Sequence, residues 1–340
     1  MYLETLSNLT GVSGNEGRVR RAIVDILTGE SFPDPSLTIR TDTLGNLLVH
    51  KPGRCRGPKV MLAAHLDEVG LMVTSVEKSG HLKFKPVGGI DPRILVSTPV
   101  RVGAREIPGV IGCKAIHLQK PQERKKPYTL DQLYIDIGAR DKEQALKLVS
   151  LGDYVSFDSN MVPIGNGCFR GKAFDDRAGC AVLIELLSRE SELSFDVAFT
   201  VQEEVGSRGA AVAAYTLQPE LAVIIEGTVA ADTPGTEPEF SVTSLGRGPA
   251  LSIMDRSFIA HRQIWQQLVS VAEQMDIPFQ YRRFAGGGTD AGVIALSREG
   301  VKAAVVSVPC RYIHTPYSVL KESDLKHTAT LIKSWLKSLV

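Results

Sequence analysis

The chain of 340 residues carries 39 lysines and arginines against 38 aspartates and glutamates, a formal net charge of +1. This balance excludes a partner held by an overall basic surface, so we expect no nucleic-acid binding. No apolar run approaches the roughly 18 residues that a membrane-spanning helix needs, and the first residues lack a secretory signal, so we expect a cytoplasmic protein with no membrane partner.

The first 67 residues predict a helix followed by short apolar strands. Apolar residues at helical spacing between Val19 and Leu27 favour the helix, and Ser13 or Asn15 could cap it. Strands are expected at 37–39, 47–49 and 60–65. The last is an almost continuous apolar run that ends at His65, which is typical of a strand buried on both faces in a parallel sheet.

From about residue 68 the pattern changes to short alternating stretches broken by glycine and proline. Strands are expected at 70–73, 81–85, 100–102 and 109–112, with one short helix near 142–148. This texture predicts a small β-rich barrel or sandwich. We therefore expect an inserted domain at 68–166 within one α/β domain formed by residues 1–67 and 167–340.

After residue 171 longer strands and helices alternate again. Strands are expected at 196–201, 221–225 and 303–308, and helices at 178–187, 261–275, 290–296 and 322–339. Such alternation predicts a mainly parallel sheet with helices on both faces, the α/β class.

Acidic residues and histidines lie just past the carboxyl ends of several predicted strands, where ligand sites form in open α/β sheets. Taken separately, each has an ordinary explanation, as a helix cap, a loop acid or a structural histidine. Their shared position instead favours a site that binds metal ions. The set consists of His65, Asp67, Asp175, Asp176, Glu203, Glu204, Glu226 and His314.

The acidic pairs suggest a division of roles. Asp175 and Asp176 open a predicted helix, and since one cap suffices, the other carboxylate could bridge two cations. Glu203 and Glu204 are unfavourable neighbours unless one binds a metal and the other handles protons. The five cysteines are scattered and never spaced as Cys-x-x-Cys, which argues against a thiolate site. Imidazole and carboxylate ligands suit Zn²⁺, Co²⁺ or Mn²⁺.

Together these motifs resemble the glutamyl and deblocking aminopeptidase family of dinuclear metallopeptidases, which includes the tetrahedral aminopeptidases. The resemblance implies a zinc-peptidase-like α/β/α sandwich with an inserted small β-barrel that serves in dimerisation, and dimers that assemble into a dodecamer. The matching segments follow the order of the family through nearly the whole chain, at 10–17, 64–70, 172–177, 201–206, 286–292 and 311–316.

The resemblance also implies a metal-dependent aminopeptidase that removes N-terminal residues from peptides with a free amino terminus. It implies two divalent ions per subunit, one held by His65, Asp175 and Glu226, the other by Asp175, Glu204 and His314. Asp175 would bridge the two ions. A water between them would then be activated for attack on the peptide carbonyl.

Two further residues receive catalytic roles from the resemblance. Asp67 would orient His65, as carboxylates often do for metal-bound histidines. Glu203 would be the general base that takes a proton from the water and delivers it to the leaving amine. One departure stands out, because the family usually has aspartate where this chain has Glu226; Ser207 and Thr315 also replace more usual residues.

Other interpretations remain at this point. The same fold could support a metal-dependent deacylase of small amides, or a binding or scaffold protein in which Glu226 no longer supports both ions. Some relatives have carried cellulase labels, but a glycosidase needs two carboxylates flanking a sugar bond and has no use for two histidine ligands and a bridging aspartate.

Two more segments are candidate binding elements. The glycine-rich loop at 286–288 precedes a predicted helix capped by Thr289 or Asp290, and the resemblance places Gly287, Gly288 and Thr289 in the substrate pocket. A simple flexible turn explains the glycines equally well. The basic cluster at 123–126 has no interleaved aromatic residues, which favours a solvated loop or a subunit contact over a nucleic-acid patch.

Overall fold

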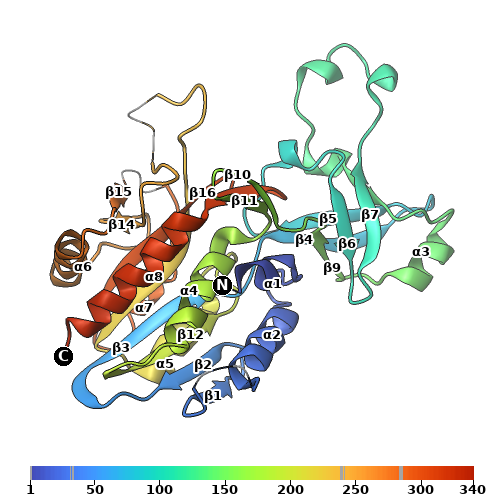
Figure 1. The fold of residues 1–340 in the computed structure, drawn as a ribbon. Coiled ribbons are helices and arrows are strands. Elements are labelled where there is room, and N and C mark those ends of the chain that lie inside the picture. The colour runs from blue at the N-terminus through green and yellow to red at the C-terminus, as the bar shows by residue number, and fades with distance from the viewer. Residues whose placement is uncertain (1, 31, 33, 238–239, 241, 283–285) are drawn as a thin grey trace.

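The computed structural model describes residues 2–30, 32, 34–237, 240, 242–282 and 286–340. Its main body is one sheet with helices on both faces, and a separate barrel projects from it (Figure 1). The strands of the main sheet follow the order β1-β2-β12-β3-β13-β16-β17-β11-β10, with β14 beside β16 and β15 beside β14. They are β1 (Thr38–Thr41), β2 (Leu47–Lys51), β3 (Cys55–His65), β10 (Val162–Gly165), β11 (Cys168–Gly171), β12 (Leu193–Thr200), β13 (Leu221–Val229), β14 (Ala250–Ser252), β15 (Gln280–Arg282), β16 (Lys302–Arg311) and β17 (Ser318–Lys321).

The centre of the sheet is parallel. Strands β12, β3, β13 and β16 run in the same direction, and their interiors are continuous apolar runs, as expected for strands covered on both faces. The prediction of a mainly parallel sheet is wrong for the flanks, where β2 pairs antiparallel with β12 and β17 antiparallel with β16. Short turns connect several flanking strands, and a short turn can join only antiparallel neighbours.

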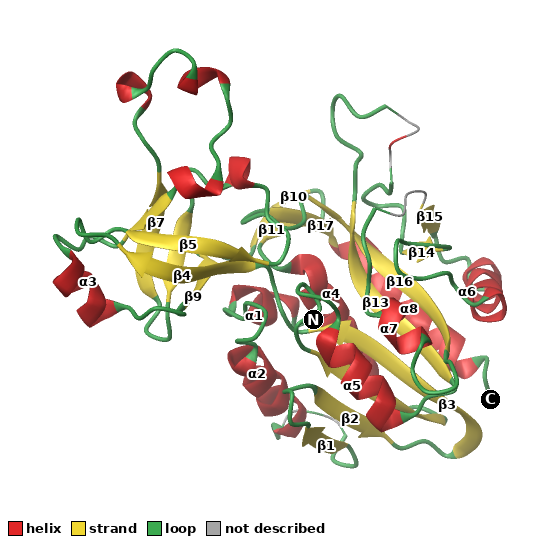
Figure 2. Ribbon diagram, turned by 180° about the vertical axis from the view of Figure 1, so that it is seen from behind, coloured by secondary structure: helices red, strands yellow, loops and turns green. Residues whose placement is uncertain are grey.

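Helices cover both faces of this sheet (Figure 2). Alternate residues of β3 point to opposite layers, so that Leu62 packs with α4 on one face and Ala63 packs with α5 on the other. The α/β/α fold class is thus confirmed. The helices of this body are α1 (Leu3–Asn8), α2 (Gly17–Thr28), α4 (Phe174–Leu187), α5 (Arg208–Leu217), α6 (Arg262–Gln274), α7 (Ala291–Ala295) and α8 (Glu322–Lys337).

The inserted segment forms a closed antiparallel barrel with strand order β4-β5-β8-β7-β6-β9 and its own apolar core. Strand β10 lies inside the predicted insertion at 68–166 but pairs in the main sheet, so the barrel itself ends at Phe157. The division of the chain into two domains stays a prediction. The barrel elements are β4 (Gly70–Val76), β5 (Leu82–Val87), β6 (Pro99–Val102), β7 (Ile107–Gly112), β8 (Tyr134–Asp136), β9 (Tyr154–Phe157) and α3 (Lys142–Leu148).

The expected helix caps are wrong in detail. Helix α2 begins after Glu16 without a side-chain cap, and Ser13 instead donates to Asp67, 54 residues further on. Helix α7 likewise has no side-chain cap, because Thr289 donates to Asp255 and Asp290 accepts from Thr200. Among the described residues no helix is long and apolar enough to cross a membrane.

Candidate active site

Parallel strand ends bring the predicted residues together. His65 is the last residue of β3, paired with Thr200 at the end of β12, and Glu203 and Glu204 follow in the next loop. Strand β13 continues to Val229, four residues beyond its predicted end, so Glu226 lies within the strand rather than after it. All of these positions lie at one edge of the sheet.

Asp175 lies between the two histidines. One of its carboxylate oxygens, Oδ1, is 3.3 Å from His65 Nε2, and the other, Oδ2, is 3.6 Å from His314 Nε2. On the first side, Glu226 Oε2 is also 3.6 Å from His65 Nε2. On the second, Glu204 Oε1 is 3.3 Å from His314 Nε2. The structure thus brings together two groups of three side chains that share Asp175.

The Nδ1 atom of each histidine has a partner that orients the ring. His65 Nδ1 lies 3.2 Å from the backbone oxygen of Asp67 and 3.4 Å from its Oδ1. His314 Nδ1 lies 2.9 Å from the backbone oxygen of Gly89, in the loop that follows barrel strand β5. With Nδ1 donating to these oxygens, both Nε2 atoms face the carboxylates with a free lone pair, the arrangement typical of metal-bound histidine.

Asp67 is fully buried and does more than contact His65. Its carboxylate oxygens accept hydrogen bonds from the backbone N–H groups of Glu203 and Glu204, each at 3.1 Å, and from Ser13 Oγ at 2.5 Å. One carboxylate therefore positions both a histidine and the loop that carries two acids. The roles of Ser13 and Gly89 were missed in the sequence, because each contact joins segments far apart in the chain.

The two neighbouring aspartates of α4 have separate environments. Asp176 is buried, accepts from Gly179 N at 2.9 Å in the first turn of the helix, and accepts from His65 N at 3.2 Å. Asp176 is therefore the aspartate that caps, which leaves Asp175 to face the histidines. Only the fold could assign the two roles, since the sequence offers both residues at the same helix start.

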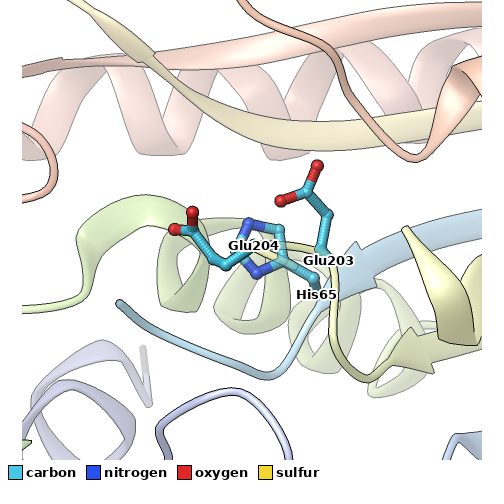
Figure 3. A group of neighbouring side chains, drawn as sticks. All are labelled: His65, Glu203 and Glu204. Carbon is cyan, nitrogen blue, oxygen red and sulfur yellow. The ribbon is translucent and has the colours of Figure 1, made fainter. Parts of the chain in front are cut away.

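Figure 3 shows His65 at the end of β3 with the side chains of Glu203 and Glu204 beside its ring. The two glutamates come from one loop, and their carboxylates point in different directions. Ligand atoms of these three residues lie within 4.8 Å of one another, a third group that could hold a metal ion. Glu203 is thus close enough to the cluster to act on a water or substrate bound there.

The electrostatics of the cluster favour added positive charge. Burial raises the pKa of the Glu203 carboxyl to about 9, that of Glu204 to about 7, and also raises the pKa of Glu226. Burial alone would lower the pKa of His314, but contact with Asp175 and the charge of Glu204 raise it to about 9. For Asp175, burial raises the pKa, but the contacts with the two histidines outweigh burial and hold the pKa below its usual value. Bound cations would offset the excess of acids.

A buried atom supports the same conclusion. Glu226 Oε1 has no hydrogen-bond partner among the described residues, a costly state for a carboxylate oxygen away from water. Ligand atoms of His65, Asp175 and Glu226 lie within 4.8 Å of one another, as do those of Asp175, Glu204 and His314. Imidazole and carboxylate groups at this spacing fit a transition-metal ion, and no thiolate lies among them.

The cluster lines a cavity of about 1260 Å³. Gly287, Gly288 and Thr289 line it, as the sequence predicts for a substrate pocket, together with apolar side chains such as Val293 and Ile313. The basic cluster at 123–126 lies instead in an exposed loop of the barrel. A cavity with a largely apolar lining and a cluster of ionisable side chains is a typical small-molecule or peptide site.

Glu68, the residue that follows Asp67, belongs to a buried ion pair that sequence analysis missed. Lys172 Nζ contacts both carboxylate oxygens of Glu68, at 2.7 and 2.8 Å, and donates to Leu9 O at 2.7 Å. Glu68 also accepts from Gly11 N at 2.9 Å. The pair thus ties the segment just after Asp67 to the amino-terminal segment, which stabilises the position of Asp67.

Replacing Lys172 by methionine should lower the free energy of unfolding by about 3 kcal/mol, because the buried Glu68 carboxylate would lose its nearest cation and keep only Arg177, whose Nη2 lies 3.7 Å away. Urea denaturation of the metal-loaded protein would measure the loss. The matched control is Lys147→Met, which removes an exposed ion pair with Glu143 and should cost under about 1 kcal/mol. Equal losses in both variants would contradict a structural role for the buried pair.

Comparison with known proteins assigns the chain to a peptidase family. The family model described as M42 glutamyl aminopeptidase matches residues 45–331, which is most of the chain. The chain belongs to this family. It is therefore an aminopeptidase, a hydrolase of peptide bonds, in a family of metal-dependent peptidases, and the resemblance inferred from its motifs is confirmed.

Solved structures cover nearly all of this M42 chain. A TET aminopeptidase from the archaeon Thaumarchaeota archaeon SCGC AB-539-E09 is 34% identical, with a TM-score of 0.93 over 99% of this chain and 98% of its own. The dodecamer PhTET1-12s is 32% identical, with a TM-score of 0.84 over 98% and 97%. A structure named as an endoglucanase, from Thermotoga maritima, is 39% identical, with a TM-score of 0.80 over 100% of both chains.

Proposed function

We propose that this M42 aminopeptidase uses two divalent metal ions, Zn²⁺, Co²⁺ or Mn²⁺, held by the two groups that share Asp175. The observation that carries the proposal is the position of Asp175, with one oxygen toward His65 and the other toward His314. Glu226 completes the first group and Glu204 the second. The unpartnered Oε1 of Glu226 supports this ligand set.

Divalent ions in these positions would supply Lewis-acid polarisation of the scissile carbonyl and would lower the pKa of bound water. Glu203 is the general base: it accepts a proton from the attacking water and later delivers that proton to the leaving amine. Bound cations would lower the pKa of the Glu203 carboxyl and so favour the ionised form that a general base requires. The contact between Asp67 and the Glu203 backbone N–H keeps the base in place.

The substrates are peptides with a free amino terminus. The free amine at the amino end of a peptide would bind one of the ions, which accounts for exopeptidase rather than endopeptidase action. Gly287, Gly288 and Thr289 would contact the substrate from the wall of the cavity.

The proposal extends to assembly. We propose that the inserted β-barrel contacts a second copy and that dimers form a dodecamer. The related PhTET1-12s structure is a dodecamer. The barrel projects away from the sheet, so its outer surface is available for such contact (Figure 1). The cytoplasmic location stays a prediction.

Metal removal tests the function. Treatment with a chelator should abolish release of the first residue from unblocked aminoacyl amides, and Zn²⁺, Co²⁺ or Mn²⁺ should restore it, because activity depends on ions held by His65, Asp175 and His314. Metal analysis of the same samples should give two ions per subunit. Full activity in the chelated, metal-free protein would overturn the proposal.

The same assay separates the alternative functions. A metal-dependent deacylase would hydrolyse N-acetylated amino acids better than free peptides, whereas the aminopeptidase requires a free amine. Parallel assays with cellulose oligomers test the activity for which the Thermotoga maritima structure is named. We expect no sugar release, because the histidines and bridging aspartate serve no purpose in glycoside hydrolysis.

A further inference from the structure

The loop that carries Glu203 is held through its backbone. Four consecutive backbone N–H groups at the start of this loop donate to side chains of other segments. The pairs are Val201 with Asn46 at 3.0 Å, Gln202 with Glu16 at 3.1 Å, and Glu203 and Glu204 with Asp67 at 3.1 Å each. The three acceptors lie between 136 and 186 residues earlier in the chain. The position of the loop therefore depends on these three distant side chains.

Glu16 is a buried acid that forms no ion pair within the described ranges of the chain. The residue directly precedes helix α2, yet its carboxylate turns back toward the loop, where Oε1 accepts from Gln202 N and also from Gly14 N at 2.6 Å. Burial raises the pKa of this carboxyl above its usual value, so the position is unfavourable for an acid. The two hydrogen bonds offset that cost.

The contact with Glu16 falls where the backbone of the loop needs support. Gln202 has a φ of 57°, in the left-handed region that residues other than glycine adopt rarely. The next residue is Glu203, so a change in the backbone of Gln202 would move the carboxylate that acts as the base. A misplacement of about 1 Å at a reacting group can cost about 100-fold in rate. A small shift here would thus have a large effect.

The segment that carries Glu16 is itself fixed. Ser13 N donates to Glu68 O at 3.2 Å, and Ser13 Oγ donates to Asp67. Helix α2 follows directly, with Val19 in the main apolar core. Because both sides of Glu16 are anchored, its carboxylate meets the loop from a rigid support.

We propose that Glu16 is a positioning residue for the general base Glu203 and acts through the backbone N–H of Gln202. The inference rests on the proposed function, which makes Glu203 the base. Glu16 is not among the described residues that line the cavity, so its effect on the reaction passes through the loop. Loss of the contact should lower kcat and leave KM and metal content close to their wild-type values.

Three substitutions at this one position test the contact. Glu16→Gln keeps an oxygen that can accept both hydrogen bonds and should keep most of the wild-type kcat. Glu16→Met has similar length but no such oxygen, and should reduce kcat by about 10- to 100-fold, the range for partners that orient an active-site group. Glu16→Asp is too short to reach Gln202 N and should show a similar loss. Aspartate is favoured before a helix, so E16D serves even where E16M fails to fold.

The matched control is Glu4→Met, an exposed acid of helix α1, which should leave kcat unchanged. Wild-type kcat in E16D and in folded E16M overturns the proposal. A loss in E16Q as large as that in E16M also overturns it, because the contact needs the accepting oxygen and not the charge. Loss of metal from E16D would place its effect on the ions instead, which again overturns the proposal.

A double variant shows whether Glu16 acts through Glu203. Residues that act as a unit are not additive, so adding E16D to E203Q should lower the remaining kcat by less than about twofold. A further loss as large as the one that E16D causes beside an intact Glu203 overturns the proposal, since Glu16 would then act on another part of the site.

Hydrogen exchange separates this inference from the proposed function. Mass spectrometry of the metal-loaded enzyme follows exchange in a peptide that covers residues 201–207, and exchange there should be faster in E16D than in wild type or E16Q. Wild-type kcat in E203Q means that the proposed base fails. Loss of activity in E203Q, with kcat and exchange of E16D equal to the wild-type values, means that only the role of Glu16 fails.

Discussion

Replacing Glu203 by glutamine is expected to reduce kcat by about 10²- to 10⁴-fold, the usual contribution of a general base, while metal content stays near that of the wild type. Glutamine keeps the shape of the side chain but cannot accept the proton of the attacking water. Its backbone N–H still donates to Asp67, so the loop should keep its position. Turnover of an unblocked aminoacyl amide, with metal analysis of the same sample, measures both effects.

The Glu203 experiment also separates two roles for this residue. Glu203 belongs to one group of possible metal ligands with His65 and Glu204, so loss of an ion together with activity would identify it as a ligand rather than the base. Wild-type kcat in E203Q would refute either role. Glu299→Gln, an exposed acid after α7, is the control and should change neither rate nor metal content.

Replacing Asp175 by asparagine is expected to lower metal affinity by more than about 100-fold, the upper range for partners that merely orient a ligand, and to abolish activity. The amide keeps one oxygen but turns an NH₂ group toward one of the histidines, where a shared ligand is needed. Because Asp175 faces both groups, the loss should affect both ions. Equilibrium dialysis against Zn²⁺ measures the number of ions and their affinity.

Two variants control the Asp175 experiment. Asp25→Asn, on the exposed side of α2, changes the net charge by the same amount and should keep both ions. Glu204→Gln alters the second group and leaves the first, formed by His65, Asp175 and Glu226, unchanged, so it should weaken one ion more than the other. Retention of two tightly bound ions in D175N would contradict the bridging role and with it the proposed two-ion centre.

Several features of this protein follow from local sequence alone. Apolar runs that end in His65, or just before Glu203, predict buried parallel strands, and the rule that parallel strands align their carboxyl ends predicts that these residues meet. The short alternating segments after residue 68 also predict the inserted β structure, because apolar and polar residues alternate along a strand that has one buried face. Periodicity is a property of neighbouring residues, so no fold is needed to detect it.

Contacts between distant segments lie beyond such patterns. The sequence marks Asp175 and Asp176 as a pair, but only the tertiary structure assigns Asp176 to the helix start and Asp175 to the histidines. Likewise, nothing near Ser13 in the chain indicates that it donates to Asp67.

The difference between what the sequence predicts and what only the structure decides has one physical reason. Local spacing determines which faces of helices and strands are apolar, and that pattern specifies the α/β layers and the edge where charged residues collect. Which polar atom meets which depends on how the layers pack, as when barrel residue Gly89 accepts from His314, 225 residues away. The sequence by itself predicted the kind of site and the side chains that meet there; the tertiary structure decided the partner of each polar atom.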